Sequence, residues 1–387
     1  MRTHQNAQHP FTCSRLNLNK VSYLLFFIVG LSIGFTGSFY VKGFSLYLKS
    51  TFSYSFLPAT FDPLFLQPTS SPKSPLQQLQ PTLNAPPTMI IEKENVMHSM
   101  EDKELFLRAS SLPKIDHKFG VGKVAFMYLT RGPLPFSPLW EKFFRGNEGM
   151  YSIYVHPDPS YNESITQGNV FFGTRVPSQE VEWGKPTMVD AERRLLANAL
   201  LDFSNQRFIL LSESCIPLFN FTTVYNHLMN SSQSFVSSYD DPRKSGRGRY
   251  NPLMSPNITI SQWRKGSQWF EISRDLAMKI VSDQKYYPIF HQHCSPPCYM
   301  DEHYIPTLLN ILCPENNSNR TITWVDWSKP APHPGRFDRQ SISEELLNRI
   351  RFGTNCSYNG NNMTLCFLFA RKFMPNALQP LMQLGLV

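Results

Sequence analysis

The sequence is poor in charge and lacks motifs that mark common classes of nucleotide-dependent enzymes. Lys, Arg, Asp and Glu make up 17% of the 387 residues, whereas an average soluble domain has roughly 25%. Neither a G-x-G-x-x-G fingerprint nor a P-loop lysine motif occurs, and no D-x-D step is present. These absences disfavour hydride transfer on a dinucleotide-binding fold and P-loop phosphoryl transfer.

The overall composition nevertheless describes a folded, moderately basic protein. Hydrophobic residues make up 41% and aromatic residues 13% of the chain, which excludes a wholly disordered protein. Lys and Arg number 37 against 29 Asp and Glu, which gives a net charge of +8. Because this charge is moderate and spread along the chain, it does not indicate nucleic acid as a partner.

One long apolar run stands near the N-terminus. Residues 21–41 carry no charge and lie between Lys20 and Lys42, and this length suffices for one transmembrane helix. A cleaved signal peptide is the alternative, although the run is longer than a usual signal-peptide core. Basic residues within 1–20 predict a cytosolic tail there, a signal anchor at 21–41, and a lumenal or extracellular remainder.

Two features of the remaining chain agree with a lumenal location. The first is a set of N-x-S/T acceptor sequons, all of which follow the apolar run. They begin at Asn162, Asn220, Asn230, Asn257, Asn316, Asn319, Asn355 and Asn362. The second is an even set of six cysteines, as disulfides require, although the pairing cannot be read from the sequence. They are Cys215, Cys294, Cys298, Cys313, Cys356 and Cys366.

A change of composition divides the rest of the chain into a stem and a globular part. Residues 42–120 are rich in Pro and Ser, and frequent proline breaks both helices and sheet ladders. We therefore expect a Pro/Ser-rich stem at 42–120 and a lumenal domain at 121–387.

The lumenal domain alternates strand and helix patterns, which predicts an α/β fold with a mostly parallel central sheet. Expected strands cover 123–130, 150–156, 207–212, 235–239, 321–326 and 364–370. Expected helices cover 186–202, 273–282 and 302–312, with another begun by a Ser341/Glu344 capping box and a last one at the C-terminus. Ligands of such sheets bind beyond the carboxyl ends of the strands. The residues that follow strands are Arg131, Asp158, Glu213, Asp240 and Arg371.

Two neighbouring segments each allow two interpretations. Cys294 and Cys298 have a zinc-like spacing beside two histidines, but in an oxidising lumen a small disulfide loop is the favoured interpretation. Asp301 and Glu302 precede an expected helix. They are either a charge complement to its N-terminus or a general base held by the preceding loop.

Basic and aromatic residues supply further candidates. Arg371 and Lys372 follow a strand and are either a solvated pair or a phosphate grip, which Arg336 and Arg339 could join. The basic run 243–249 is expected to be a mobile loop that holds an anion or closes over a site. Trp324 is expected in the core, and Trp269 is a candidate for stacking on a sugar.

Taken together, several segments resemble a known family. They are KVAFMYLTRGPLP, YSIYVHPDP, VEWGKPTMVDAERRLL, FILLSESCIPL, KGSQWFEISRDLA, CYMDEHYIPTLL, ITWVDWS and LCFLFARKF. In this order they are similar to the plant branch of the core-2/I-branching β-1,6-N-acetylglucosaminyltransferases, over about residues 123–384. The resemblance implies a GT-A-like glycosyltransferase domain behind a type II Golgi membrane anchor.

The resemblance also implies a mechanism and its residues. Glu302 falls on the family's catalytic base, and Lys372 falls on its diphosphate-binding lysine. Arg371 lies beside Lys372, and Arg336 or Arg339 is the expected second cation. The implied reaction is inverting, needs no metal or other cofactor, and transfers a sugar from a UDP-sugar to a glycan hydroxyl, with UDP-GlcNAc as the default donor.

Departures from the animal pattern leave donor and acceptor open. Asp158 stands near the place of an animal aspartate close to the nucleotide base, and Glu213, Trp269 and Asp301 are further nucleotide or acceptor candidates. Transfer of glucuronate or xylose is the alternative activity. A binding protein or scaffold without activity, or a structural cell-surface glycoprotein, is the alternative of another class.

Overall fold

The computed structural model describes residues 97–111, 121–329 and 331–386, all within the unit Thr88–Val387. The expected cytosolic tail (1–20), the expected anchor (21–41) and most of the expected stem lie outside the described residues. Within the described ranges, no helix is long and apolar enough to cross a membrane.

The centre of the domain is a four-stranded sheet with the order β2-β1-β3-β5. Its strands are β1 (Lys123–Leu129), β2 (Tyr151–His156), β3 (Asn205–Ser212) and β5 (Glu271–Ser273). β1 runs parallel to both β2 and β3, and β5 adds an antiparallel edge. The expected mixed α/β fold with a mostly parallel sheet is confirmed.

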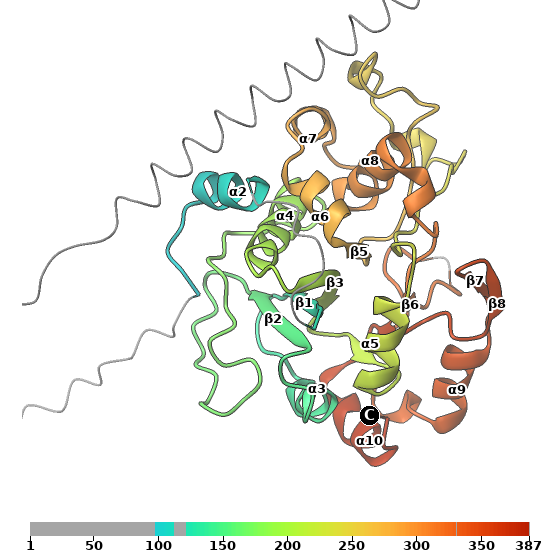
Figure 1. The fold of residues 1–387 in the computed structure, drawn as a ribbon. Helices are drawn as coiled ribbons and strands as arrows, with labels where there is room; N and C mark the ends of the chain where they lie inside the picture. Colours follow the sequence, from blue (N-terminus) through green and yellow to red (C-terminus); the bar gives the residue numbers. More distant parts are fainter. Residues whose placement is uncertain (1–96, 112–120, 330, 387) are drawn as a thin grey trace, which may run out of the picture. The chain divides into compact units, whose positions relative to one another are not determined.

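Alternating residues of β1 point into two separate cores. Ala125 and Met127 belong to a core that also contains side chains of α2, α4, α6, α7 and α8. Val124, Phe126 and Tyr128 belong to the opposite core, with α3, α5, α9 and α10. Because neighbouring side chains of a strand point to opposite faces, a continuous apolar strand requires cover on both faces, and helices supply it (Figure 1).

The described helices are short. They are α2 (Asp102–Ser110), α3 (Ser137–Phe144), α4 (Thr187–Leu200), α5 (Phe221–Met229), α6 (Arg274–Val281), α7 (Tyr286–His293), α8 (Tyr304–Leu312), α9 (Glu344–Phe352) and α10 (Leu378–Gln383). Single 3-10 turns are η1 (Arg247–Arg249), η2 (Pro252–Met254), η3 (Met300–Glu302), η4 (Pro314–Asn316), η5 (Arg339–Ser341) and η6 (Pro375–Ala377).

A second small sheet brings the C-terminal part of the chain against the first. Its order is β4-β9-β6, from β4 (Ile216–Pro217), β9 (Phe369–Arg371) and β6 (Thr323–Val325). β4 follows β3 closely in the chain, so the loop after β3 and the end of β9 are brought together. A separate hairpin of β7 (Cys356–Tyr358) and β8 (Asn361–Met363) is closed by the Cys356–Cys366 disulfide.

Two expected strands differ from the structure. The segment 235–239 makes only isolated bridges, Phe235 with Glu271 and Tyr239 with Lys265. The strand expected at 364–370 begins only at Phe369, because Cys366 is held in its disulfide and in a turn to Thr364. Apolar composition predicted both strands, but the neighbouring segments pair with only a few of their residues, so the strands are short or absent.

Two helix starts also differ from the expectation. The cap of α9 is Ser343, whose hydroxyl accepts from Leu346 N, whereas Ser341 bonds to Asp338. The helix expected from Glu302 is interrupted at His303, whose φ of −126° separates η3 from α8. His303 Nδ1 lies 2.8 Å from the Arg264 carbonyl oxygen and fixes this break.

The expected stem boundary at residue 120 is wrong, because α2 belongs to the folded domain. Leu105 and Ala109 of α2 are buried in the core. Asp102 forms an ion pair with the buried Arg194 of α4 at 2.6 Å. The folded domain therefore includes residues 97–111, and a protein truncated at residue 121 would expose this face of α4.

Candidate active site

The candidate base lies directly after a small disulfide loop. Cys294 and Cys298 form a disulfide, so the disulfide interpretation is confirmed and the zinc interpretation is wrong for these two sulfurs. Tyr299 follows in the left-handed region with φ of 56°, and Met300–Glu302 then forms η3. The disulfide loop thus sets the direction of the backbone that leads into Asp301 and Glu302.

Two cations hold the Glu302 carboxylate. Lys265 Nζ donates to Glu302 Oε2 at 2.5 Å, and Arg249 Nη1 donates to the same oxygen. Burial alone would raise the pKa of Glu302, but the charges and hydrogen bonds of Lys265 and Arg249 outweigh it and hold that pKa below its usual value. Glu302 is therefore ionised at neutral pH, and both cations contact Oε2 rather than Oε1.

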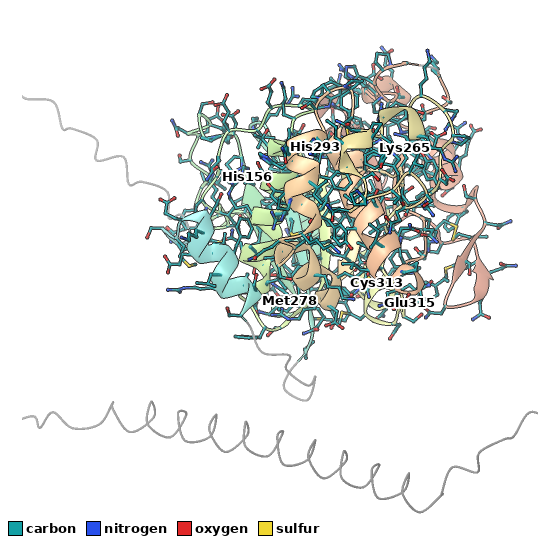
Figure 2. All side chains as sticks on the ribbon, turned by 90° about the horizontal axis from the view of Figure 1, so that it is seen from above. His156, Lys265, Met278, His293, Cys313 and Glu315 are labelled. Carbon is teal, nitrogen blue, oxygen red and sulfur yellow. A yellow bond between two sulfur atoms is a disulfide. The ribbon has the colours of Figure 1, made fainter. Side chains whose placement is uncertain are left out.

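The position of Lys265 depends on the glycine that follows it. Gly266 N donates to the Glu302 carbonyl oxygen at 2.8 Å. A Cβ at this position would lie 1.9 Å from the Ser237 carbonyl oxygen, which no side chain can satisfy without a shift of the backbone. Only glycine allows this close approach, and Figure 2 shows Lys265 on its loop.

Two further acids lie near this site, the half-buried Asp301 and the fully buried Glu192. Burial, followed by the charge of Glu302, raises the pKa of Asp301 to about 6. Burial, followed by the charge of Asp301, raises the pKa of Glu192 well above its usual value. Glu192 Oε1 accepts from Gln268 at 3.0 Å. Glu192 Oε2 and Asp301 Oδ1 are buried without a hydrogen-bond partner among the described residues.

We expect Glu192→Gln to be more stable than the native protein above pH 5, by a margin that grows toward pH 8. The folded pKa of Glu192 is raised, so the unfolded chain releases this proton first and the native free energy of unfolding falls as pH rises. Gln keeps the carbonyl that accepts from Gln268 and cannot ionise. Thermal unfolding from pH 5 to pH 8 measures the difference. The exposed Glu345→Gln should show no such trend, and a difference for Glu192→Gln that is constant with pH would contradict the assignment.

A basic cluster surrounds Lys372 at the end of β9. Burial lowers the pKa of Lys372, and the positive charges of Arg371, Arg336 and Arg131 lower it further, against an opposite effect of Glu213. Arg131 and Glu213 follow β1 and β3, and both act electrostatically on Lys372 at the end of β9. Four cations around one acid leave an excess of positive charge that a bound anion would neutralise.

Arg371 stacks on Trp269, and its buried Nε has no hydrogen-bond partner among the described residues. The Arg371 guanidinium lies 3.9 Å from the centre of the Trp269 ring, and burial lowers the pKa of Arg371. Trp269 is only 6% exposed, so its use as an open sugar-stacking surface is not supported. Trp324, expected in the core, is half-buried and packs against Phe337.

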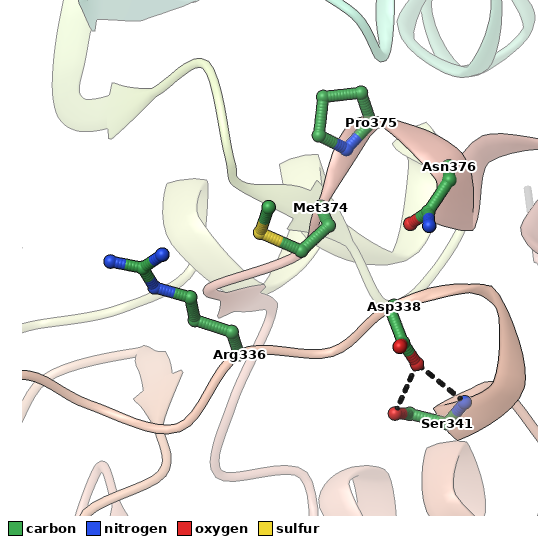
Figure 3. A pocket seen from close by; sticks show the side chains of 6 residues that line it. All are labelled: Arg336, Asp338, Ser341, Met374, Pro375 and Asn376. Carbon is green, nitrogen blue, oxygen red and sulfur yellow. Dashed lines mark hydrogen bonds between the residues drawn. The ribbon is translucent and has the colours of Figure 1, made fainter.

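Arg336 and Arg339 have different surroundings. Arg336 acts electrostatically on Lys372, and Phe337 N donates to the Lys372 carbonyl oxygen at 2.9 Å. Arg336 also lines a pocket of about 540 Å³, whose other lining residues are Asp338, Ser341, Met374, Pro375 and Asn376 (Figure 3). Arg339 is an exposed residue of η5 outside that lining.

The remaining acidic candidate and the basic run are held by local bonds. Asp158 accepts from Ser160 N and Oγ, and these bonds hold the pKa of Asp158 below its usual value. The run 243–249 is tied down, because Arg243 pairs with Asp241 and Arg247 with Asp240. The expected mobility of this loop stays a prediction; the structure adds that the segment supplies Arg249 to Glu302.

The exposed sequons agree with the expected lumenal location, whereas the six cysteines are only partly paired. The asparagines of all eight sequons are exposed. Two disulfides form, while Cys215 and Cys313 are buried and free. The even set of six is thus not fully paired, and Figure 2 shows Cys313 on the side of the molecule away from His156 and Lys265.

The sequence analysis missed Lys265 and Arg249 as partners of Glu302, and also missed Glu192. None of these residues forms a recognisable sequence motif with the residue that it contacts. Gly266, an isolated glycine between two tryptophan-containing stretches, was the available signal, because such a glycine can mark close approach of two backbones. The buried acid in the middle of α4 gave no signal beyond its place on an apolar helix.

The domain thus carries an ionised carboxylate, Glu302, and a separate set of basic residues around Lys372. Residues 124–351 match the Core-2/I-Branching enzyme family. A curated relative, "Glycosyltransferase BC10" of Oryza sativa subsp. japonica, is 34% identical over 313 residues, which are 69% of this chain and 78% of that protein. The chain belongs to the core-2/I-branching enzyme family and is a glycosyltransferase. The rice relative agrees with the expected plant branch.

A solved structure of an active-site mutant of LgtC also matches. It has a TM-score of 0.31 and 7% identity, and covers 64% of this chain and 86% of that chain. The likeness is too distant to add to the fold described above.

Proposed function

We propose that the chain is an inverting, metal-independent glycosyltransferase with a GT-A-like domain, which moves a sugar from a UDP-sugar to a hydroxyl of a glycan. The observation that carries this proposal is the Glu302 carboxylate, ionised and fixed through one oxygen by Lys265 and Arg249. A base must be ionised and positioned before it can accept a proton; the two cations keep Glu302 in that state, at the cost of lower basicity.

In the proposed reaction, Glu302 Oε1 takes the proton of the acceptor hydroxyl. The acceptor oxygen forms a bond with the anomeric carbon of the donor sugar. The bond from that carbon to the β-phosphate oxygen breaks, and the electron pair leaves with the nucleoside diphosphate. Attack opposite to the leaving group inverts the anomeric configuration.

Negative charge grows on the leaving oxygen, so the leaving diphosphate needs fixed positive charge. Lys372 and Arg336 supply this charge in the proposal, and Arg131 and Arg371, which lies over Trp269, add to the positive charge around Lys372. The lowered pKa of Lys372 supports an anion site, because a bound diphosphate would offset the neighbouring positive charges.

We propose metal independence because the same cations can neutralise the diphosphate and because the two adjacent aspartates are already in ion pairs. The chain has no D-x-D step, and the adjacent Asp240 and Asp241 are already paired with Arg247 and Arg243. The basic cluster would therefore take the part that a divalent cation plays at other diphosphates.

A donor screen in the presence and absence of a chelator tests the proposal. The full chain is offered UDP-GlcNAc, UDP-GlcA, UDP-Xyl, UDP-Gal and UDP-Glc, and release of UDP is followed. We expect one donor, by default UDP-GlcNAc, to be turned over at a rate that EDTA leaves within about twofold, which is below the 1.4 kcal/mol of a tenfold effect. Loss of turnover in EDTA that added Mn²⁺ restores would contradict metal independence.

The same screen separates the alternatives. Preferred turnover of UDP-GlcA or UDP-Xyl would replace the default donor and keep the mechanism. Failure of every donor to bind to the folded protein would favour the binding or scaffold protein instead.

The location proposed for this activity is the Golgi membrane, with the type II topology expected from residues 1–41. The exposed sequons and the two disulfides support a lumenal catalytic domain. Accumulation of a tagged chain at the plasma membrane would instead favour a structural cell-surface glycoprotein.

A further inference from the structure

An exposed tryptophan lies close to Glu302 and has no part in the function proposed so far. Trp183 is 52% exposed and precedes α4. Its ring centre lies 5.1 Å from that of Tyr299 and 5.7 Å from that of His333. An indole that remains half exposed beside two other rings leaves apolar ring surface open to solvent.

The loop that carries Trp183 is fixed in place. Glu182 N donates to Thr187 Oγ1 at 2.9 Å, and Lys185 N donates to the Glu182 carbonyl oxygen at 3.1 Å. Gly184 has φ of +79°, and a Cβ there would lie 3.0 Å from Tyr299 Cε1. The loop therefore packs closely against the Tyr299 ring, and hydrogen bonds on both sides of Trp183 position its backbone.

This surface is connected to the candidate base by direct contacts. The Arg249 guanidinium lies 4.5 Å from the centre of the Tyr299 ring and donates to Glu302. Glu302 N also donates to the Tyr299 carbonyl oxygen at 3.0 Å. Tyr299 and Arg249 are thus the residues between Trp183 and the carboxylate.

We propose that Trp183 is the stacking surface for a neutral pyranose ring of the acceptor glycan beside Glu302. A pyranose has an apolar C–H face that fits an indole, and a rim of hydroxyls that needs polar partners. Lys185 and Glu182 lie 3.9 Å apart with side chains 45% and 71% exposed, and His333 adds a ring nitrogen. Because Lys185 and Glu182 offset each other's charge, the polar side chains around Trp183 suit a neutral sugar rather than the diphosphate.

This inference rests on the proposed function, and the test separates the two. Binding of UDP to the full chain is measured by calorimetry. In the presence of UDP, binding of three neutral probes is then measured by saturation-transfer NMR. The probes are methyl β-D-galactopyranoside, methyl β-D-glucopyranoside and methyl β-D-xylopyranoside. The variants are Trp183→Ala and Trp183→Phe. The control is Phe203→Ala, because Phe203 is also an exposed aromatic residue but lies before the start of β3.

We expect at least one probe to bind the native protein, and Trp183→Ala to weaken it about tenfold, which corresponds to 1.4 kcal/mol. Trp183→Phe should recover most of that loss, and Phe203→Ala should cause none. All variants should bind UDP with unchanged affinity. Unchanged probe affinity in Trp183→Ala, or no binding of any probe to native protein that binds UDP, would overturn the inference. Absence of UDP binding by the native protein would instead contradict the proposed function itself.

Discussion

Glu302→Gln is expected to lower the rate of sugar transfer by about 10²–10⁴-fold, the usual contribution of a positioned general base. The amide has the size of the carboxylate but cannot accept the proton of the acceptor hydroxyl. The measurement is kcat for the donor found in the screen, together with the affinity for UDP. UDP affinity should remain within about threefold, because the basic cluster near Lys372 is unchanged.

The control for this substitution must separate lost chemistry from lost structure. Glu302→Gln would leave Lys265 and Arg249, whose side chains are 14% and 18% exposed, without their carboxylate, so some loss of stability is expected. Retained UDP binding shows that the variant is folded, and Glu345→Gln serves as a neutral comparison. Full activity of Glu302→Gln would remove Glu302 from the catalytic role.

Lys372→Ala is expected to weaken the binding of UDP by about 10- to 100-fold. A hydrogen bond to a charged group contributes about 1.5–3 kcal/mol, and the substitution removes one cation from the cluster that faces the diphosphate in our proposal. The free protein should not lose stability through charge effects, since Lys372 is repelled by Arg371, Arg336 and Arg131. Calorimetric titration with UDP measures the change directly.

The exposed Lys142→Ala on α3 provides the matched control, because it removes the same charge elsewhere on the domain. A salt series adds a second readout. The difference in affinity between native protein and Lys372→Ala should shrink as ionic strength rises, because salt screens the attraction of a partly exposed cation for the diphosphate. Equal UDP affinity of the native protein and Lys372→Ala would sink the diphosphate role.

Strand positions, motif order and class could be predicted from the sequence because they depend on local patterns. The apolar runs of β1, β2 and β3 were found within two residues of their ends, since a strand covered on both faces is apolar throughout. The Cys294–Cys298 disulfide is confirmed, because the close spacing of two cysteines in an oxidising compartment favours a small disulfide loop. The family was recognised from the order of several loose motifs and is confirmed.

Features that depend on packing between distant segments could not be predicted. Residues 97–111 read as stem, yet α2 is bound to the domain through Asp102 and Arg194, which are far apart in the sequence. The sequence showed 243–249 as a basic run, but only the fold shows that its Arg249 contacts Glu302 and that its other arginines pair with Asp240 and Asp241. Trp269 read as a sugar contact, but the guanidinium of Arg371 covers it.

The sequence by itself determined the α/β class and the family, because apolar runs and the order of several motifs can be recognised in the chain. Through the resemblance to that family it also singled out Glu302 and Lys372 as candidates. The tertiary structure alone decided which cations hold Glu302, which of the neighbouring basic residues acts on Lys372, and that Trp183 is exposed beside Tyr299. These are questions of distance and burial between segments that are far apart in the sequence, and only the folded core fixes them.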